Sequence, residues 1–398
     1  MNKDILNTDI QLFIAKNIDT DIVSLLLKKP IFNTVSPKEL AEQIESKKRC
    51  RNKLPTWFKT AQIYYPKKLN IEQSSSEIAA RYKSEIVSGK TLVDLTGGLG
   101  VDCYYFAQKM KSVIYCEINA ELAEIAAHNF NILGVENIQT FLRDGVSFLK
   151  EEKRKFDWLY LDPSRRSDKK GKVFHLSDCS PDVTQHYELL FRSTKNLLIK
   201  TAPFLDISSA LKDMKYARTL HIVAIDNEVK ELLWVMRKNY TGQVLVKTRN
   251  YYKGRSQTFD FYFDEEQESN SDLGAPMKYL YEPNAAIMKS GAFKTISSRY
   301  ALKKLHQHTH LYTSDDLLDF PGRIFVIREC LPCNSKAKSI LTGKKANIST
   351  RNFPKSVTAI KKKYKITDGG KIYLFFTKNM DNKLVVLHCE KLDRLVLF

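Results

Sequence analysis

The sequence predicts an α/β protein whose main domain contains a doubly wound, mostly parallel sheet. From residue 91 onward, short apolar runs alternate with amphipathic stretches, which is typical of right-handed β-α-β crossovers. The first run, TLVD at 91–94, leads directly into the glycine-rich turn LTGGLG and then a helical stretch. The chain of 398 residues, 43% of them hydrophobic, is long enough for two or three domains.

Residues 1–89 are expected to form an N-terminal helical region. Ser36 and Glu39 match a capping box that also has proline at the first helical position. Ser74 and Glu77 match a second capping box, which would open a helix that ends at Gly89. This helix would lead into the sheet domain, expected at 90–263.

The turn after the first strand is a candidate ligand site. Gly97, Gly98 and Gly100 allow the backbone to turn tightly and to approach a ligand closely. A helix over 101–110 would direct its free amide donors into the same crevice, at the carboxyl edge of the sheet. Glu117 ends the next strand, 20 residues after Gly97, which is the offset expected of a carboxylate that binds a ribose.

The strands that follow complete the predicted sheet. A helix over 119–133 is expected to end at Gly134. The remaining strands are expected at 137–142, 157–161, 197–201, 220–225 and 232–236. Together with the first two, they make seven.

The segment Asp94-Leu-Thr-Gly-Gly-Leu-Gly100 resembles the first motif of class I S-adenosylmethionine-dependent methyltransferases, although Thr96 stands where a glycine is usual. The resemblance implies a Rossmann-like seven-stranded methyltransferase sheet and S-adenosylmethionine as the cofactor. It implies that Asp94 and the turn face the methionine end, Glu117 binds the ribose hydroxyls, and Asp144 flanks the adenine. Gln73, just ahead of the core, is a further candidate. The implied cofactor-binding residues are Asp94, Thr96, Gly97, Gly98, Gly100, Glu117, Asp144 and Gln73.

The fourth strand is expected to deliver Asp162-Pro-Ser-Arg-Arg166 to the carboxyl edge of the sheet. A carboxylate there can orient an incoming amine or accept its proton, although methyl transfer depends mainly on alignment. Enzymes that methylate amino groups of nucleic acids usually have a second proline and then an aromatic residue here; Ser164 and Arg165 depart from that pattern. Arg165 can stack on a base or bind a phosphate. The predicted catalytic residues are Asp162, Pro163, Arg165 and Lys200, with Arg166 as a substrate-binding residue.

Two cysteine arrangements suggest other chemistry. Methylation of a ring carbon would need a cysteine nucleophile, for which Cys179 is the candidate, against the alternative of a packed thiol. Cys330 and Cys333 have metal-ligand spacing without a second matching pair, so no metal is expected.

The C-terminal part carries much of the positive charge. After an acidic linker at 264–274, a small α+β segment is expected at 275–322 and a basic domain at 323–398. Residues 323–378 hold 14 Lys and Arg against two acidic residues, a net +12 of the chain's +19. The pattern there predicts a β-α-β-β unit with a basic helix.

This region resembles the THUMP-like C-terminal domain of a largely uncharacterised bacterial group of class I methyltransferases. The motifs that carry the resemblance include STRNFP at 349–354 and YEPNA at 281–285, the latter in a segment expected to be ferredoxin-like. By similarity to true THUMP domains, the resemblance implies RNA, either tRNA or rRNA, as the partner. Arg351, Lys361 and Lys362 are the corresponding candidate substrate-binding residues.

The sequence therefore predicts a methyltransferase that acts on a base in RNA. Two alternatives remain open, a methyltransferase for a protein or small molecule and a non-catalytic RNA-binding protein. Seven scattered cysteines favour a reducing compartment. No signal segment is evident at 1–29, and no stretch approaches the roughly 18 apolar residues of a membrane helix. A cytoplasmic location without membrane insertion is expected.

Overall fold

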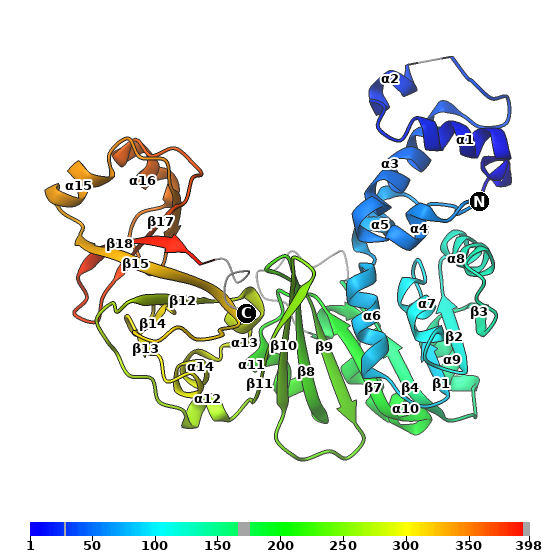
Figure 1. Cartoon of the computed structure of the whole chain (residues 1–398). Helices are drawn as coiled ribbons and strands as arrows, with labels where there is room; N and C mark the ends of the chain where they lie inside the picture. Colours follow the sequence, from blue (N-terminus) through cyan, green and yellow to red (C-terminus); the bar gives the residue numbers. More distant parts are fainter. Residues whose placement is uncertain (28, 166–175, 393–398) are drawn as a thin grey trace. The chain divides into compact units, whose positions relative to one another are not determined.

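A computed structural model describes residues 1–27, 29–165 and 176–392 (Figure 1). The chain forms two compact units, one of Met1–Ala217 with Leu233–Tyr240 and one of Arg218–Leu232 with Thr241–Phe398. The boundaries expected at 89/90 and 263/264 do not coincide with this division. Within the described ranges, no helix combines the length and the apolarity that crossing a bilayer requires.

The N-terminal region is helical, as expected. Its helices are η1 (Lys3–Leu6), α1 (Thr8–Lys16), α2 (Ile22–Leu26), α3 (Pro37–Lys53), α4 (Pro55–Lys59), α5 (Lys68–Gln73) and α6 (Glu77–Ile86). The capping box of α3 is confirmed, since Glu39 N donates to Ser36 Oγ at 3.2 Å and Ser36 N donates to Glu39 Oε2 at 2.8 Å. The prediction for α6 was wrong by two residues. Its N-cap is Ser76, and Ser74 instead ends α5, where its hydroxyl donates to Ile71 O.

These helices share a hydrophobic core with α7 and α8, two helices of the sheet domain, which is why residues 1–89 do not form a separate unit. Trp57 of α4 is buried and lies 4.9 Å from the ring of Tyr104 in α7 (Val101–Ala107), measured between ring centroids. The same hydrophobic cluster includes Ile44 of α3 and Ile125 of α8 (Ala120–Ile132).

The large sheet has nine strands in the order β11-β10-β8-β9-β7-β4-β1-β2-β3. The seven expected strands are present as β1 (Thr91–Asp94), β2 (Ser112–Glu117), β3 (Ile138–Leu142), β4 (Phe156–Leu161), β7 (Thr194–Thr201), β8 (Ala217–Ile225) and β9 (Glu228–Arg237). Strands β1, β2, β3, β4 and β7 form a parallel series. The further helices of this part are α9 (Gly145–Glu151), α10 (Tyr187–Ser193) and α11 (Ile207–Asp213).

The expected count of seven strands is corrected by a hairpin. β10 (Leu245–Tyr252) pairs in parallel with β8 and antiparallel with β11 (Arg255–Tyr262). The turn between them contains Lys253 and Gly254, both at positive φ, as a two-residue hairpin turn requires. Alternate β10 residues are buried, so the signal was a weak alternation without a continuous apolar run.

The second sheet has seven strands in the order β13-β14-β12-β15-β18-β17-β16. These are β12 (Tyr279–Pro283), β13 (Lys303–Lys304), β14 (Tyr312–Ser314), β15 (Gly322–Pro332), β16 (Asn347–Thr350), β17 (Ile372–Lys378) and β18 (Leu384–Lys391). The helices are α12 (Glu265–Glu268), α13 (Ala285–Ser290), α14 (Phe293–Arg299), α15 (Ser335–Leu341) and α16 (Val357–Tyr364). β16, α16, β17 and β18 confirm the predicted β-α-β-β unit.

Two of the boundaries expected in this region do not separate independent parts of the structure. β15 pairs with both β12 and β18, so the segments 275–322 and 323–398 contribute to one sheet. The expected linker 264–274 includes α12, and Glu266 there accepts hydrogen bonds from Lys294 N and Thr295 N at the start of α14. The linker is therefore attached to the domain that follows it.

Candidate active site

The candidate site lies at the carboxyl edge of the parallel strands. β1 lies between β2 and β4, which are both parallel to it. Asp94 ends β1, Glu117 ends β2, and Asp162 directly follows β4. In open α/β sheets, ligands bind outside the carboxyl ends of the strands, where the strand order reverses. The topology thus brings the three predicted acids to the same edge.

The carboxylate of Asp94 is buried, since only 1% of the residue is exposed. Its Oδ1 accepts hydrogen bonds from Thr96 N at 2.9 Å and Thr96 Oγ1 at 3.3 Å. Its Oδ2 accepts one from Cys103 Sγ at 3.2 Å. Burial raises the pKa of Asp94 to about 7, against the lowering effect of these hydrogen bonds. A cationic partner would therefore stabilise the ionised form of this carboxylate.

Thr96 connects the glycine turn to the predicted catalytic loop. Its hydroxyl accepts a hydrogen bond from Asp162 N at 2.7 Å while it donates to Asp94. Glycine at this position has no hydroxyl and would leave Asp162 N without this acceptor. The departure from the family motif at Thr96 thus has a structural role, which the sequence alone did not reveal.

The three glycines of the turn have different roles. A Cβ on Gly97 would lie 2.2 Å from the ring of Tyr115, and one on Gly100 would lie 2.4 Å from the ring of Phe130. These two glycines therefore permit close packing inside the fold. Gly98 has a φ of +57°, and the nearest atom to its hypothetical Cβ is 3.8 Å away. Of the three, only Gly98 faces open space.

Replacement of Gly97 by alanine is expected to destabilise the protein by about 1–3 kcal/mol, because the Tyr115 ring would have to move. Gly134→Ala is the comparison, since its φ is +71° but no atom lies within 4 Å of the added Cβ. That variant should be destabilised by about 1 kcal/mol, because only the strain of a positive φ opposes the alanine. Urea unfolding of both variants measures the difference, and equal losses would argue against the packing role.

Glu117 lies against the glycine turn. Its Oε2 accepts a hydrogen bond from Gly98 N at 2.7 Å, and its Oε1 accepts one from Asn119 N at 2.8 Å. Ile118, the next residue, is 74% exposed, and Leu142, which pairs with Glu117 in register, is 61% exposed. A carboxylate is thus flanked by apolar side chains at one strand edge. Sequence reasoning missed Ile118, whose signal was an apolar residue directly after the acid.

Asp144 and Gln73 have less distinctive surroundings. Asp144 follows β3 and caps α9, accepting a hydrogen bond from Ser147 N at 2.7 Å. Gln73 is the last residue of α5 and is exposed. Their assignment to the cofactor stays a prediction.

Asp162 and Lys200 form an ion pair. The parallel pairing of Leu161 with Ile199 sets the two residues opposite each other at the ends of β4 and β7. Both side chains are partly buried, with 34% and 14% of their surface exposed. Partial burial strengthens the attraction relative to a surface pair, so the carboxylate is held in one orientation.

The loop after Asp162 is only partly described. β5 (Ser164–Arg165) pairs antiparallel with β6 (Cys179–Ser180), which brings the backbones of Arg165 and Cys179 together. Pro163 and Cys179 are buried. Arg166 and the lysines at 169, 170 and 172 lie outside the described residues. The 3-10 helices η2 (Leu176–Asp178) and η3 (Val183–His186) follow.

A buried ionic cluster, which sequence reasoning missed, lies behind the turn. Lys83 is fully buried and pairs with Asp102 at 3.1 Å. Asp102 also accepts hydrogen bonds from Ser75 Oγ at 3.0 Å and Tyr160 Oη at 2.7 Å. Burial alone would raise the pKa of Asp102, but the charges of Lys83 and Lys200 and the hydrogen bonds from Tyr160 and Lys83 hold it below the ordinary value. The cluster fixes α6 and α7 against β4, next to Asp162.

Phe204 is a second residue that the sequence analysis missed. It follows β7 by three residues and is 84% exposed, the largest exposure among the exposed large hydrophobic side chains of the described residues. The signal was an aromatic residue in the short turn after Lys200, where a polar residue would be expected. Its place at the carboxyl end of the strand paired with β4 makes it a candidate substrate contact.

The predicted RNA-binding residues lie in the second unit, and two of them have acidic partners. Arg351 pairs with the buried Glu282 at 2.9 Å. Lys361 pairs with Asp368 through Nζ and Oδ2 at 2.7 Å, and Lys362 is exposed. In the described part of the chain, no three His, Cys, Asp or Glu side chains gather in a way that could hold a metal.

Comparison with known proteins agrees with this architecture. A ferredoxin-like domain family matches residues 279–321, and a THUMP domain-like family matches residues 322–391. An uncharacterised RNA methyltransferase of Mycoplasma mobile is 29% identical over 165 residues, and this chain spans only 44% of that curated relative's length.

One crystal structure matches nearly the whole chain. It is that of a protein from Porphyromonas gingivalis W83 that was assigned as a methyltransferase, with a TM-score of 0.86 and 33% sequence identity. The match covers 98% of this chain and 99% of that one. The chain therefore belongs to the same family, the class I S-adenosylmethionine-dependent methyltransferases with a THUMP-like C-terminal domain.

Proposed function

We propose that the protein transfers a methyl group from S-adenosylmethionine to a base in tRNA or rRNA. The observation that carries the proposal is the continuous chain of contacts from Asp94 through Thr96 to Asp162 and Lys200. It connects the turn expected to bind the cofactor with the loop expected to hold the substrate. A rigid link between the two sites suits a reaction that depends on alignment.

The residues at the strand edge suit this cofactor. Asp94 supplies a buried carboxylate for the ammonium group, and its raised pKa means that a cation there would be strongly favoured. Glu117 supplies carboxylate oxygens for the ribose diol, and Ile118 supplies an apolar surface for the adenine ring. When bound, S-adenosylmethionine would supply an electrophilic methyl group on a positively charged sulfur.

Asp162 and Lys200 are proposed to act on the methyl acceptor. Lys200 forms an ion pair with Asp162 and thereby orients one of its oxygens. The remaining acceptor positions of the carboxylate can receive a hydrogen bond from an amino group of the substrate and hold its nitrogen in line. Because methyl transfer depends mainly on alignment, Asp162 should act by positioning the acceptor.

Charge and homology support RNA as the substrate. The formal charge of +19 favours an anionic partner, and much of it lies in the THUMP-like region. The Mycoplasma mobile relative is described as an RNA methyltransferase. Such binding should weaken steeply with salt, because each neutralised phosphate releases counterions. A cytoplasmic location accords with this substrate.

The test is mass spectrometry of nucleosides from the tRNA and rRNA of cells with and without the gene. One methylated nucleoside should disappear and should return on incubation of that RNA with the full-length protein and S-adenosylmethionine. Identical nucleoside profiles in both RNA pools would rule the proposal out.

We expect Phe204→Ala to reduce kcat/KM for RNA about tenfold, because stacking of a base on an aromatic ring contributes about 1–3 kcal/mol. Phe204→Trp should preserve activity, since a planar ring remains. Leu69→Ala is a matched control, because Leu69 is an exposed apolar side chain on α5. Activity that falls equally in Phe204→Trp and Phe204→Ala would contradict stacking.

A further inference from the structure

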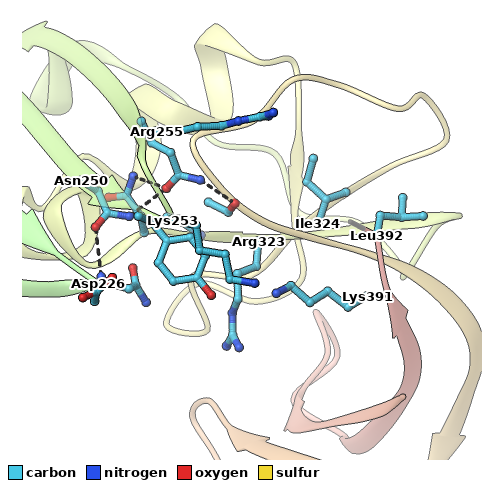
Figure 2. Close-up of a pocket in the computed structure, with 14 residues that line it drawn as sticks. Asp226, Asn250, Lys253, Arg255, Arg323, Ile324, Lys391 and Leu392 are labelled. Carbon is cyan, nitrogen blue, oxygen red and sulfur yellow. Dashed lines mark hydrogen bonds between the residues drawn. The ribbon is translucent and has the colours of Figure 1, made fainter. Parts of the chain in front are cut away.

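A cavity of about 360 Å³ lies within the second unit, and none of its lining residues is assigned to the cofactor or to methyl transfer (Figure 2). Its walls come from two hairpin turns, β8–β9 and β10–β11, and from the start of β15 and the end of β18. The volume is within the range of small-ligand sites, about 300–1,000 Å³.

The cavity is positively charged. Lys253, Arg255, Arg323 and Lys391 line it, against a single acid, Asp226. In the part of the chain that the structure describes, Lys253, Arg255 and Lys391 form no ion pair. Cationic groups without acidic partners around one cavity favour an anionic ligand.

Arg323 adds to this excess. It shares the buried carboxylate of Glu282 with Arg351, donating through Nε to Oε2 at 2.6 Å while Arg351 binds Oε1 at 2.9 Å. Two guanidinium groups thus surround one carboxylate, and one positive charge remains uncompensated. Figure 2 shows Lys391 and Arg323 extending into the same space.

One part of the cavity is apolar. Ile324 and Leu392 lie together at one end, joined by a hydrogen bond from Leu392 N to Ile324 O at 2.9 Å (Figure 2). Tyr252 contributes a half-buried ring, and Lys253 Nζ lies 5.6 Å from its centroid. An aromatic face beside a cation suits a ligand that carries both a planar ring and a negative charge.

A network of amides holds the cavity in shape. Gln257 Oε1 accepts hydrogen bonds from Asn250 Nδ2 at 2.9 Å and from Asn284 Nδ2 at 3.2 Å. Gln257 Nε2 donates to Gly322 O at 3.1 Å. Asn250 and Asn284 are buried, so their side chains are fixed by the fold. The cavity is therefore formed before any ligand arrives, which lowers the entropic cost of binding.

The turn residue Lys253 has an unfavourable conformation for lysine. Its φ is +49°, a region in which asparagine and glycine are preferred. Asparagine would suit the turn better, so the presence of lysine suggests that its charge is used.

From these observations we infer that the cavity binds one phosphorylated nucleotide of an RNA strand, with the base against Tyr252 and the phosphate among Lys253, Arg255 and Lys391. The inference rests on the proposed function for the identity of the strand, because a protein that methylates RNA has RNA as its anionic substrate. A pocket that combines ring and phosphate recognition would fix where the substrate lies.

The test uses the full-length protein and calorimetry with uridine and adenosine 5′-monophosphates, the matching nucleosides, inorganic phosphate and an acidic peptide. The variant is Lys253→Asn with Lys391→Gln, in which the turn keeps a favourable residue. The control is Lys338→Gln with Lys344→Gln, which removes the same charge from exposed positions that do not line the cavity.

We expect the monophosphates to bind more tightly than the nucleosides or phosphate, and the Lys253/Lys391 variant to lose about tenfold or more in affinity for them and for a short single-stranded RNA. The control should stay within about twofold. Equal losses in the two variants would overturn the inference, as would tighter binding of the acidic peptide or equal binding of phosphate and monophosphates.

S-adenosylmethionine binding and RNA methylation are measured on the same samples, so the two proposals fail separately. Absence of monophosphate binding by the unmodified protein, with cofactor binding and methylation intact, would refute the pocket alone. Absence of cofactor binding and methylation, with monophosphate binding that still depends on Lys253 and Lys391, would refute the proposed function alone.

Discussion

Replacement of Asp162 by alanine should reduce methyl transfer by about 10²- to 10⁴-fold. The affinity for S-adenosylmethionine should change little, because the contact of Asp162 with the cofactor turn is made by its backbone, whose N donates to Thr96 Oγ1. Alanine keeps that hydrogen bond. The loss should therefore appear in kcat, since the carboxylate that orients the acceptor is gone while the cofactor site remains.

Single-turnover methylation of RNA and calorimetry with S-adenosylmethionine measure the two effects. Asp162→Asn is the informative comparison, because the amide keeps an acceptor oxygen without the charge that Lys200 pairs with. It should be intermediate in rate if orientation dominates. Full activity of Asp162→Ala would remove Asp162 from the mechanism, and a parallel loss of cofactor affinity would reassign it to the cofactor site.

Replacement of Asp94 by asparagine should stabilise the free protein at pH 8 and abolish measurable cofactor binding. Burial raises the pKa of Asp94 from 3.8 to about 7, so the folded protein holds a proton there that the unfolded chain releases above about pH 4. As pH rises from about 4 to about 7, the unfolding free energy falls, and the whole loss is present above pH 7. Asparagine does not ionise, so Asp94→Asn avoids a loss of about 2–4 kcal/mol in unfolding free energy at pH 8.

Urea unfolding of both proteins without cofactor, at pH 5 and pH 8, tests the sign. The advantage of Asp94→Asn should be larger at pH 8 than at pH 5. Asp9→Asn, at an exposed position in α1, is the matched control. In the unmodified protein, cofactor affinity should rise from pH 6 to pH 8, because Asp94 must ionise to pair with an ammonium group. An affinity independent of pH would contradict that pairing.

Local patterns in the sequence were sufficient for most of the first unit. Strands such as β2, β4 and β7 contain continuous apolar runs, and such runs carry their own signal because both faces of a parallel sheet are buried. The capping box at Ser36 is equally local. The sequence did not predict β10 and β11, because alternating burial is a weaker signal. The N-cap of α6 was misplaced because Ser74, Ser75 and Ser76 are chemically equivalent in the sequence. Only the structure shows that Ser74 ends α5 and that Ser76 caps α6.

The same distinction between local and long-range information applies to the candidate site. The sequence by itself determined the family and which acids end the strands, since strand ends and motif spacing are properties of neighbouring residues. Only the tertiary structure decided that Thr96 joins Asp94 to Asp162 and that Lys200 faces Asp162, because these contacts join residues up to 66 positions apart. It also decided the raised pKa of Asp94 and the cavity around Lys253, because burial and net local charge depend on every segment packed nearby.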